Sequence, residues 1–420
     1  MKKEQQAADN LYKTHFGKLV ASMLQFSRDI DLETAEDLVQ DSFVAALTSW
    51  KKDGVPDNPA GWIYTVCRNK ALNKIKRDKK FKNPFENNEP WSTRTTAEHE
   101  FSESIFDDQQ LKLLFSCANP RLPAKVQVVI TLKYIINLKI EAIAKVLGMT
   151  IDGIDKLLIR ARQKIKMENI FLKEPLPSSL RSRLPIVHKI LYLIFNEGYK
   201  SSWGKEVLRE ELCEDALLMT RYLLETSIHN KDTKALYALM LFNAARFKSR
   251  FGMSGELLDL EEQDRSLWNK DLVALANKFL KQSAGDTASS YHYEASIAYL
   301  HCKAKNFESI DWATIGNLYM QLLQSSPNPF VELNYAIALY FSGKKEKAFE
   351  ILTGLRQKSF LDQYYLLNAT LGKINFMEGN YNKAKEFYAK TLEQTNSETE
   401  KDFFHRMINK ISDREKLALN

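Results

Sequence analysis

The chain has 420 residues, and at roughly 100–200 residues per domain it is expected to form two to four domains. Glycine and proline are scarce and no low-complexity tract is present, as is typical of a mostly helical, soluble protein. The formal net charge of +7 is mild, and most of the basic excess lies in residues 1–170.

Two further features exclude whole classes of protein. Cys67, Cys117, Cys213 and Cys302 lie far apart without metal-ligand spacing, so each is expected to be a small buried hydrophobe. No signal peptide and no run of about 18 apolar residues appears. We therefore expect a cytoplasmic protein without a membrane segment, a metal site or a disulfide framework.

Residues 8–82 are predicted to form a first helical domain. In LETAEDLVQDSFVAALTSW, apolar residues recur at three- and four-residue steps, which predicts one buried helix face. That face consists of Leu32, Ala35, Val39, Phe43, Ala46 and Trp50. Asp37, Gln40 and Asp41 share the opposite face, which by itself is an ordinary exposed acidic surface.

The stretch NPAGWIYTVCRNKALNKIKRDKKFK, residues 58–82, is predicted to be a helix that starts at Pro59. Trp62 and Tyr64 lie near its N-terminal end, and lysines and arginines follow. Backbone phosphates require cations, and aromatic faces stack on unpaired bases, so the combination favours contact with melted or single-stranded nucleic acid. The alternative is a helix with Trp62 in the core and a solvated lysine face.

Residues 83–108 are predicted to be an acidic linker. Between positions 83 and 110 the chain has Arg94 against seven acidic residues, with two prolines and weak periodicity. The alternative to a linker with a functional role is a solvated tether that only connects the two domains.

Residues 109–170 are predicted to form a second helical domain ending in a helix-turn-helix, KIEAIAKVLGMTIDGIDKLLIRARQKIK. Ala144 is small where two helices would cross, and Gly148 can take the turn. The expected core positions are Ile140, Ile143, Leu147, Ile151, Ile154 and Leu158. The second helix is basic, which favours docking in the major groove of DNA, with a bundle that binds no nucleic acid as the alternative.

Prolines at 175, 177 and 185 mark a boundary, beyond which the chain is nearly charge-balanced and predicted to be helical. We predict a helical domain over residues 180–285 and tetratricopeptide-like repeats over residues 286–415. Two segments align Gly343 with Gly379 and Ala348 with Ala384. Both offsets, 36 residues, are close to the period of about 34 residues in tetratricopeptide repeats.

Charged residues in this half are expected to form structural ion pairs, with a buried network or ligand pocket as the alternative. They include Glu197, Glu262, Asp264 and Arg265. No nucleophile, phosphate-binding loop or metal-ligand set accompanies them, so we expect neither an enzymatic activity nor a cofactor.

These segments together resemble a known family. AEDLVQDSF with NPAGWIYTVCRNKALNKIKR resembles regions 2.2 to 2.4 of extracytoplasmic-function sigma factors, which belong to the sigma-70 family, and LKIEAIAKVLGMTIDGIDKLLIRARQKI resembles their region 4.2. LYLIFNEGYKSS, AARFKSRFGMSGELLDLEEQDRSLWN and SSPNPFVELNYAIALYFSG resemble the long C-terminal extension of one subgroup. The resemblance implies an all-α fold, with region 2 and region 4 joined by the acidic linker and followed by a helical, repeat-like domain.

The resemblance also implies partners and site residues. The implied partners are core RNA polymerase, through its β and β′ subunits, and promoter DNA. The residues implied to bind polymerase are Asp37, Leu38, Gln40 and Asp41. Those implied to bind and melt the −10 element are Trp62, Tyr64, Arg68, Asn69, Lys74, Lys76 and Arg77. Those implied to bind the −35 element are Thr150, Gly153, Lys156, Arg160 and Arg162.

Some positions depart from the family pattern. Asn73 stands where many members have Asp, and Leu157 stands where Arg is frequent. Asp152 and Asp155 place negative charge at the start of the recognition helix, where it would repel phosphate.

We expect an initiation factor whose activity is set by its own C-terminal extension, which would bind an unidentified protein or small ligand. The main alternative is a one-component helix-turn-helix regulator with a repeat-type sensor domain. It gives no purpose to the AEDLVQDSF face or to the aromatic and cationic helix. A repeat scaffold with an incidental basic part is a third interpretation.

Overall fold

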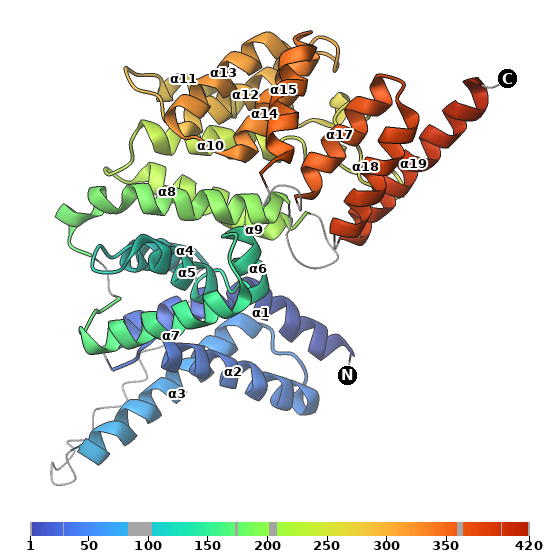
Figure 1. Ribbon diagram of the computed structural model, residues 1–420. Coiled ribbons are helices and arrows are strands. Elements are labelled where there is room, and N and C mark those ends of the chain that lie inside the picture. Colours follow the sequence, from blue (N-terminus) through green and yellow to red (C-terminus); the bar gives the residue numbers. More distant parts are fainter. Residues whose placement is uncertain are drawn as a thin grey trace. The chain divides into compact units, whose positions relative to one another are not determined.

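The computed structural model describes residues 2–27, 29–82, 103–172, 175–200, 208–358, 364–395 and 397–418. Across these residues the chain is helical, without strands beyond a single bridge between Phe251 and Leu257 (Figure 1). The predicted all-α fold is confirmed. Residues 83–102, most of the predicted acidic linker, lie outside the described residues.

Contacts divide the chain into two compact units. The first comprises Met1–Glu197 and Glu214–Ile228, and the second comprises Gly198–Cys213 and His229–Asn420. The division therefore runs through the segment 180–285.

The first unit is built around α1, which contacts α2, α3 and α4. Farther along the chain, α5, α6 and α7 contact one another. Its helices are α1 (Lys2–Phe26), α2 (Leu32–Asp53), α3 (Pro59–Lys82), α4 (Glu103–Cys117), α5 (Ala124–Tyr134), α6 (Ile140–Val146), α7 (Ile151–Met167), most of α8 (Pro177–Tyr199) and most of α9 (Glu210–Glu225).

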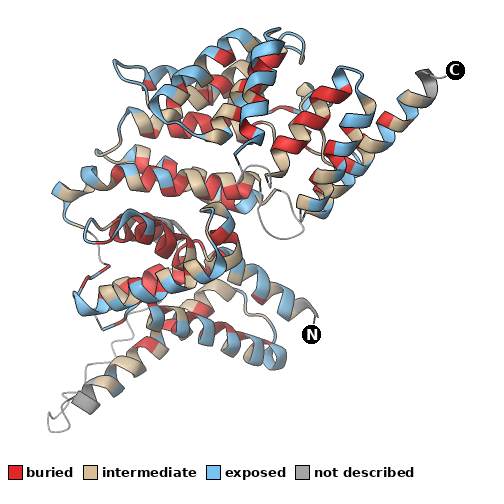
Figure 2. Ribbon diagram, in the orientation of Figure 1, coloured by how far each residue is buried: buried red, intermediate tan, exposed pale blue. Residues whose placement is uncertain are grey.

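The helix α2 shows how sequence positions its surfaces. Asp31 caps its N-terminus by accepting a hydrogen bond from the Thr34 amide, and Gly54 ends it with a φ of 84°. The six apolar residues predicted to form one face are all buried, as are Leu38 and Ser42. Buried residues likewise form stripes along the other helices (Figure 2).

A close backbone contact joins the helices before and after the linker. A Cβ at Gly17 of α1 would lie 1.6 Å from the carbonyl oxygen of Ile135, just after α5, so a larger residue cannot fit there. The Gln25 side chain also donates to the carbonyl oxygen of Leu172 at 3.4 Å. The helices α1–α3 and α4–α7 therefore pack directly on each other.

The second unit stacks consecutive helices, each packed on its neighbours. Its helices are α10 (Lys231–Ala244), η1 (Phe247–Ser249), η2 (Arg265–Leu267), α11 (Lys270–Ser283), α12 (Ser290–Lys303), α13 (Trp312–Ser325), α14 (Pro329–Phe341), α15 (Lys345–Arg356), α17 (Tyr365–Met377), α18 (Tyr381–Gln394) and α19 (Glu398–Ala418). Gly343 and Gly379 take positive φ values, 87° and 76°, in the turns that end α14 and α17. Ala348 and Ala384 are fully buried at matching places in α15 and α18.

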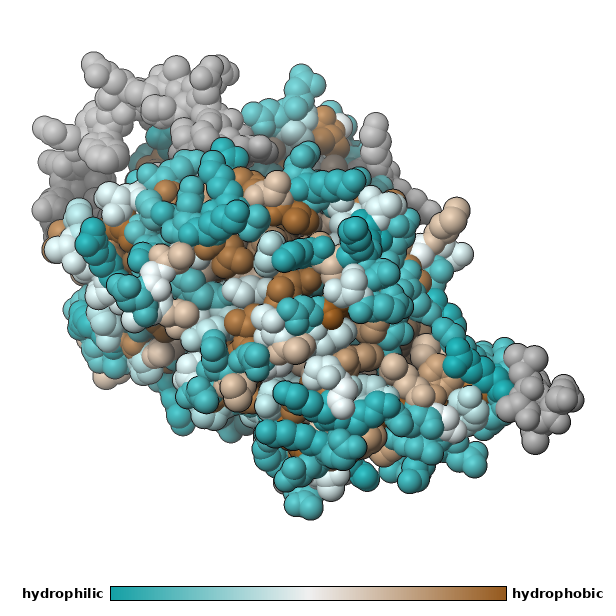
Figure 3. Space-filling model, turned by 90° about the horizontal axis from the view of Figure 1, so that it is seen from above, coloured by the Kyte–Doolittle hydropathy of each residue, from teal (hydrophilic) through white to brown (hydrophobic). Residues whose placement is uncertain are grey.

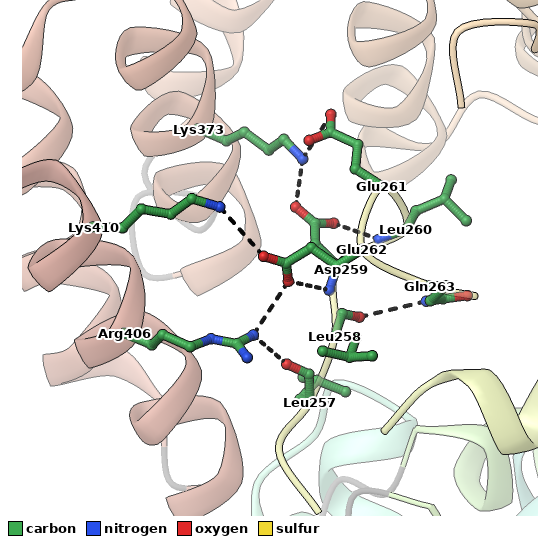
Figure 4. Close-up of polar contacts among 10 residues, drawn as sticks. All are labelled: Leu257, Leu258, Asp259, Leu260, Glu261, Glu262, Gln263, Lys373, Arg406 and Lys410. Carbon is green, nitrogen blue, oxygen red and sulfur yellow. Dashed lines mark hydrogen bonds and ion pairs between the residues drawn. The ribbon is translucent and has the colours of Figure 1, made fainter. Parts of the chain in front are cut away.

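Ion pairs tie the loop that precedes η2 to two of these helices (Figure 4). Glu262 lies 3.3 Å from Arg406 and 3.4 Å from Lys410 of α19, while Lys373 of α17 pairs with Asp259 and Glu261. The structural role expected of Glu262 is confirmed.

A glycine in the FNEGY motif also has a packing explanation. A Cβ at Gly198 would lie 2.7 Å from the Cys213 sulfur and 2.9 Å from the Arg209 carbonyl oxygen. Only glycine lets the end of α8 approach the start of α9 this closely.

Cys67, Cys117 and Cys213 are buried as expected, whereas Cys302 is half-buried. On the face seen in Figure 3, hydrophobic residues are interspersed among hydrophilic ones. Within the described ranges, no helix combines the length and apolar character needed to cross a membrane.

Candidate nucleic-acid interface

The helix α3 begins where the sequence predicts. The Asn58 side chain caps it by accepting a hydrogen bond from the Gly61 amide at 2.9 Å, and Pro59 takes the first helical position. Its buried stripe is short, with Ile63, Cys67 and Ala71 at four-residue steps. Because this buried stripe is narrow, the polar residues of α3 remain at or near the surface.

The aromatic residues of α3 lie at the edge of this stripe. Trp62 is half-buried, and its ring lies edge-on to the buried ring of Trp50, with centroids 5.8 Å apart. Tyr64 is also half-buried. Trp62 therefore combines the two interpretations, since part of its ring packs on the core and part is accessible.

The polar residues of α3 form a basic surface. Asn69, Lys76 and Arg77 are exposed, and Arg68 and Lys74 are half-buried. The ion pairs here are long and partly exposed, with Lys74 3.6 Å from Asp78 and Lys70 3.6 Å from Asp41. Such pairs contribute little to stability, so these cations remain able to bind phosphate.

The outer face of α2 is acidic and apolar. Asp37, Gln40 and Asp41 are exposed, but Leu38 is only 7% exposed and packs inside the unit. Sequence reasoning missed two residues on this face, Val44 at 62% and Leu47 at 41% exposure. Val44 lies three residues from Asp41 and four from Gln40, and Leu47 lies three residues beyond Val44, so this helical spacing was the signal that could have identified them.

The acidic residues at the start of α2 affect one another. Burial and the neighbouring charges of Glu33, Glu36, Asp41 and Asp31 raise the pKa of Asp37. Asp37 makes no ion pair with a described residue, whereas several of its neighbours are paired. Glu36 lies 2.9 Å from Lys133 of α5, and Glu33 lies 3.5 Å from Arg162 of α7.

The turn between α6 and α7 agrees with the prediction. Gly148 takes a φ of 60°, Ala144 is buried, and the Met149 amide donates to the Ala144 carbonyl oxygen at 2.8 Å. The buried residues of α7 are Ile154, Leu158, Ala161 and Ile165.

One predicted core position is wrong. Ile151 is 50% exposed, and Ile140 and Leu147 are only half-buried, while Ile143 is fully buried. Ile151 is the first residue of α7. It has the spacing of the buried stripe, but the helices that cover the rest of the stripe leave Ile151 exposed.

The residues assigned to the −35 element lie at the N-cap of α7 and along the helix. Thr150 and Gly153 form the helix cap, in which the Thr150 hydroxyl accepts a hydrogen bond from the Gly153 amide at 3.1 Å. Lys156 and Arg160 are exposed, and Asp152 pairs with Lys156 at 2.7 Å. This pair partly neutralises the acid that would repel phosphate, and Asp152 also suits the positive end of the helix dipole.

The structure places the predicted residues on α2, α3 and α7. The Lys70–Asp41 pair links α3 to α2, and the Arg162–Glu33 pair links α7 to α2. The side chains of Lys79, Lys80 and Lys82 lie outside the described residues.

Comparison with known proteins adds to this geometry. Residues 11–81 match the sigma-70 region 2 family, and residues 183–284 match a family of unknown function (DUF6596). An uncharacterized protein of Rhizobium meliloti (strain 1021) is 27% identical over 398 residues, which cover 94% of this chain and 93% of that protein. RNA polymerase sigma factor YlaC of Bacillus subtilis (strain 168) is 27% identical over 167 residues, 39% of this chain and 92% of that protein. No solved structure matches the chain.

Proposed function

We propose that this chain, whose sigma-70 region 2 and similarity to a sigma factor support membership of the sigma-70 family, is an extracytoplasmic-function sigma factor. In this proposal it binds core RNA polymerase, recognises promoter DNA through −10 and −35 elements, and melts the first of them. The observation that carries the proposal is α3, where accessible aromatic rings and a basic surface share one helix inside the region 2 match.

The face of α2 is the proposed contact with polymerase. It offers Asp37, Gln40 and Asp41 together with exposed Val44 and Leu47. Apolar side chains next to carboxylates suit a partner helix that carries apolar and basic residues. In the family this partner is the coiled coil of the β′ clamp. Leu38, being buried, would support this face from beneath.

The proposed −10 contact uses α3, and the proposed −35 contact uses α7. Trp62 and Tyr64 would stack on unpaired bases, while the exposed cations of α3 bind the backbone. On α7, Arg160 is exposed and can reach DNA directly, whereas Lys156, also exposed, first has to leave Asp152. Arg162 first has to leave Glu33, an exposed pair worth about 0–1 kcal/mol.

The C-terminal part is proposed to be a tetratricopeptide-like extension that sets the activity of the factor. The matching glycines and alanines of the pairs α14–α15 and α17–α18 support such repeats. Because most of α8 and most of α9 belong to the first unit, a chain ending at Ile228 is the appropriate truncation. If that chain equals the full chain in run-off transcription under every condition, the regulatory role is wrong.

Binding to core polymerase in the absence of DNA tests the proposal against its main alternative. The full chain should co-elute with core RNA polymerase in gel filtration. A one-component regulator would bind a DNA operator without polymerase and would elute separately. Separate elution at micromolar concentrations would contradict the proposed function.

A further inference from the structure

Four residues of the second unit, the buried Trp268 and the half-buried Arg246, Arg265 and His301, lie close together. We call them the Arg246–Arg265 cluster. Arg246 follows α10, Arg265 begins η2 and His301 lies on α12. A backbone hydrogen bond of 2.9 Å from the Asn269 amide to the Ala245 carbonyl oxygen aligns the first two segments.

Both guanidinium groups lie over the same indole. The guanidinium carbon is 5.0 Å from the Trp268 ring centroid for Arg246 and 4.5 Å for Arg265. Such stacking is favourable for each cation, but it also brings two like charges to one site. The repulsion between the two guanidinium charges has to be balanced by another interaction in the cluster.

Each member of the cluster has a buried polar nitrogen without a hydrogen-bond partner among the described residues. These atoms are Arg246 Nε, Arg265 Nη2, Trp268 Nε1 and His301 Nδ1. Trp268 is only 6% exposed. A buried polar group without a hydrogen-bond partner is destabilising, so four such nitrogens in one place, three of them N–H donors of arginine and tryptophan, require an explanation.

The protein atoms that do contact the two arginines are neutral. Arg246 donates to the Gln263 side-chain oxygen at 3.2 Å, and Arg265 donates to the carbonyl oxygens of His301 at 2.6 Å and Ala304 at 3.0 Å. Gln263 is itself held by the loop shown in Figure 4, where it donates to the Leu258 carbonyl oxygen. Neither arginine forms an ion pair with any residue that the structure describes.

The electrostatics of the cluster are those of uncompensated positive charge. Burial lowers the pKa of Arg265, and the charge of Arg246 lowers it further. The carboxylate of Glu308 raises this pKa, but by less than burial or Arg246 lowers it. Burial and the two arginines also lower the pKa of His301 to about 3, so its ring is neutral at pH 7. Removing unpaired cations from water is costly unless an anion accompanies them.

A small oxyanion would accept hydrogen bonds from the unpartnered N–H groups and would also compensate the two positive charges. Guanidinium groups bind carboxylate and phosphate through paired, charge-assisted hydrogen bonds, and an indole N–H adds a further donor. A water molecule could accept these hydrogen bonds, but it would leave both charges uncompensated. The burial of all four nitrogens limits the bound group to a small one.

We propose that the Arg246–Arg265 cluster is a binding site for a small oxyanion, either a phosphate or a carboxylate group. Three of its residues lie in AARFKSRFG and LEEQDRSLW, motifs that the polymerase and DNA contacts do not use. The site lies in the proposed extension, so the anion becomes a candidate effector if that proposal holds. Binding itself is independent of it and is tested without polymerase or DNA.

Thermal unfolding of the full chain provides the test, with inorganic phosphate, acetate or chloride at equal ionic strength and pH 7. Phosphate or acetate should raise the unfolding temperature of the second unit by roughly 5–10 °C over chloride, at about 100 times the dissociation constant. The anion that gives the rise identifies the phosphate or the carboxylate class.

The variant Arg246→Met separates this site from the basic faces of the first unit. It should lose the increase in unfolding temperature that the anion causes. In chloride it should unfold at or above the wild-type temperature, because the positive charge that repels Arg265 has been removed. The matched control is Lys248→Met, an exposed cation of the same segment, which should keep the rise. If the rise is absent, or survives in Arg246→Met, the proposal is wrong.

A second variant covers the case in which Arg246→Met does not fold. Trp268→Phe keeps an aromatic ring beneath the guanidinium groups and removes only the N–H donor. Isothermal titration of the effective anion should show affinity reduced about tenfold. Unchanged affinity in this variant would place the anion elsewhere on the chain and would overturn the assignment.

Discussion

Trp62 has two different surroundings in the free chain. One edge packs on buried Trp50, and the rest of the half-buried ring is accessible from solvent. The edge contact fixes the direction of the ring before any nucleic acid arrives, which lowers the entropic cost of stacking on a base. The proposed role of Trp62 in promoter melting is therefore compatible with its contact with the core.

Trp62→Ala should impair strand opening more than duplex binding. Loss of the Trp50 contact costs about 0.5–1.5 kcal/mol, which a domain can tolerate, whereas each lost base stack weakens the open complex roughly 5- to 150-fold. Permanganate reactivity of promoter thymines measures opening directly. Trp62→Phe retains an aromatic ring and should keep most of the strand opening. Unchanged thymine reactivity in Trp62→Ala would refute the role of Trp62 in melting.

The exposed cations of α3 predict a salt effect of known size. Replacing Lys76 and Arg77 with Gln removes two phosphate contacts, so the slope of log affinity against log salt should become shallower by about 2. Promoter binding by the holoenzyme at several salt concentrations gives this slope. A slope identical to that of the wild type would show that these side chains do not contact the backbone.

At the scale of elements, α2 divides its residues between a core face and a binding face. Leu38, Val39 and Phe43 hold the helix in the unit, and Val44 and Leu47 remain exposed on the other side. Because Val44 and Leu47 are exposed, they contribute little to the packing of the first unit. Their role is therefore expected in the contact with polymerase.

Val44→Asp combined with Leu47→Asp should weaken binding to core polymerase about tenfold or more, because two apolar contacts become repulsive or unsatisfied. The stability of the free chain should change by no more than about 0.5 kcal/mol per substitution, since both side chains are exposed. Ile159→Asp, an equally exposed aliphatic residue of α7, serves as the control and should leave polymerase binding intact. Equal effects in both variants would remove the assignment of α2.

At the scale of the whole molecule, the sequence predicts local features better than tertiary ones. The start of α3 at Pro59, the buried face of α2 and the turn at Gly148 each depend on a few neighbouring residues, and all are confirmed. Ile151 is wrong because spacing alone cannot show where the covering helices end. The Arg246–Arg265 cluster could not be predicted, since it forms only when η2, α10 and α12 come together.

Buried thiols give the molecule a predictable response to pH. Burial raises the pKa of Cys67 and Cys302 to about 11 and that of Cys117 to about 12, compared with about 8.5 for an unfolded thiol. Their contribution to stability is complete below pH of about 8.5 and is lost as the pH rises through these values. The free energy of unfolding, measured in urea, should therefore fall between pH 9 and pH 11.

Cys117→Ala isolates one of these thiols. The fall in stability between the two pH values should be smaller in this variant than in the wild type, whatever its stability at pH 8. An identical fall in both proteins would show that the Cys117 thiol does not contribute.

Reconstituted run-off transcription tests the central claim most directly. Core RNA polymerase with the full chain is used to select promoters from a random library, and the selected templates are then transcribed with and without the chain. We predict discrete transcripts that require the chain and start downstream of paired −10 and −35 motifs. Failure to select any promoter, or transcripts that appear equally with core polymerase alone, would contradict a role as an initiation factor.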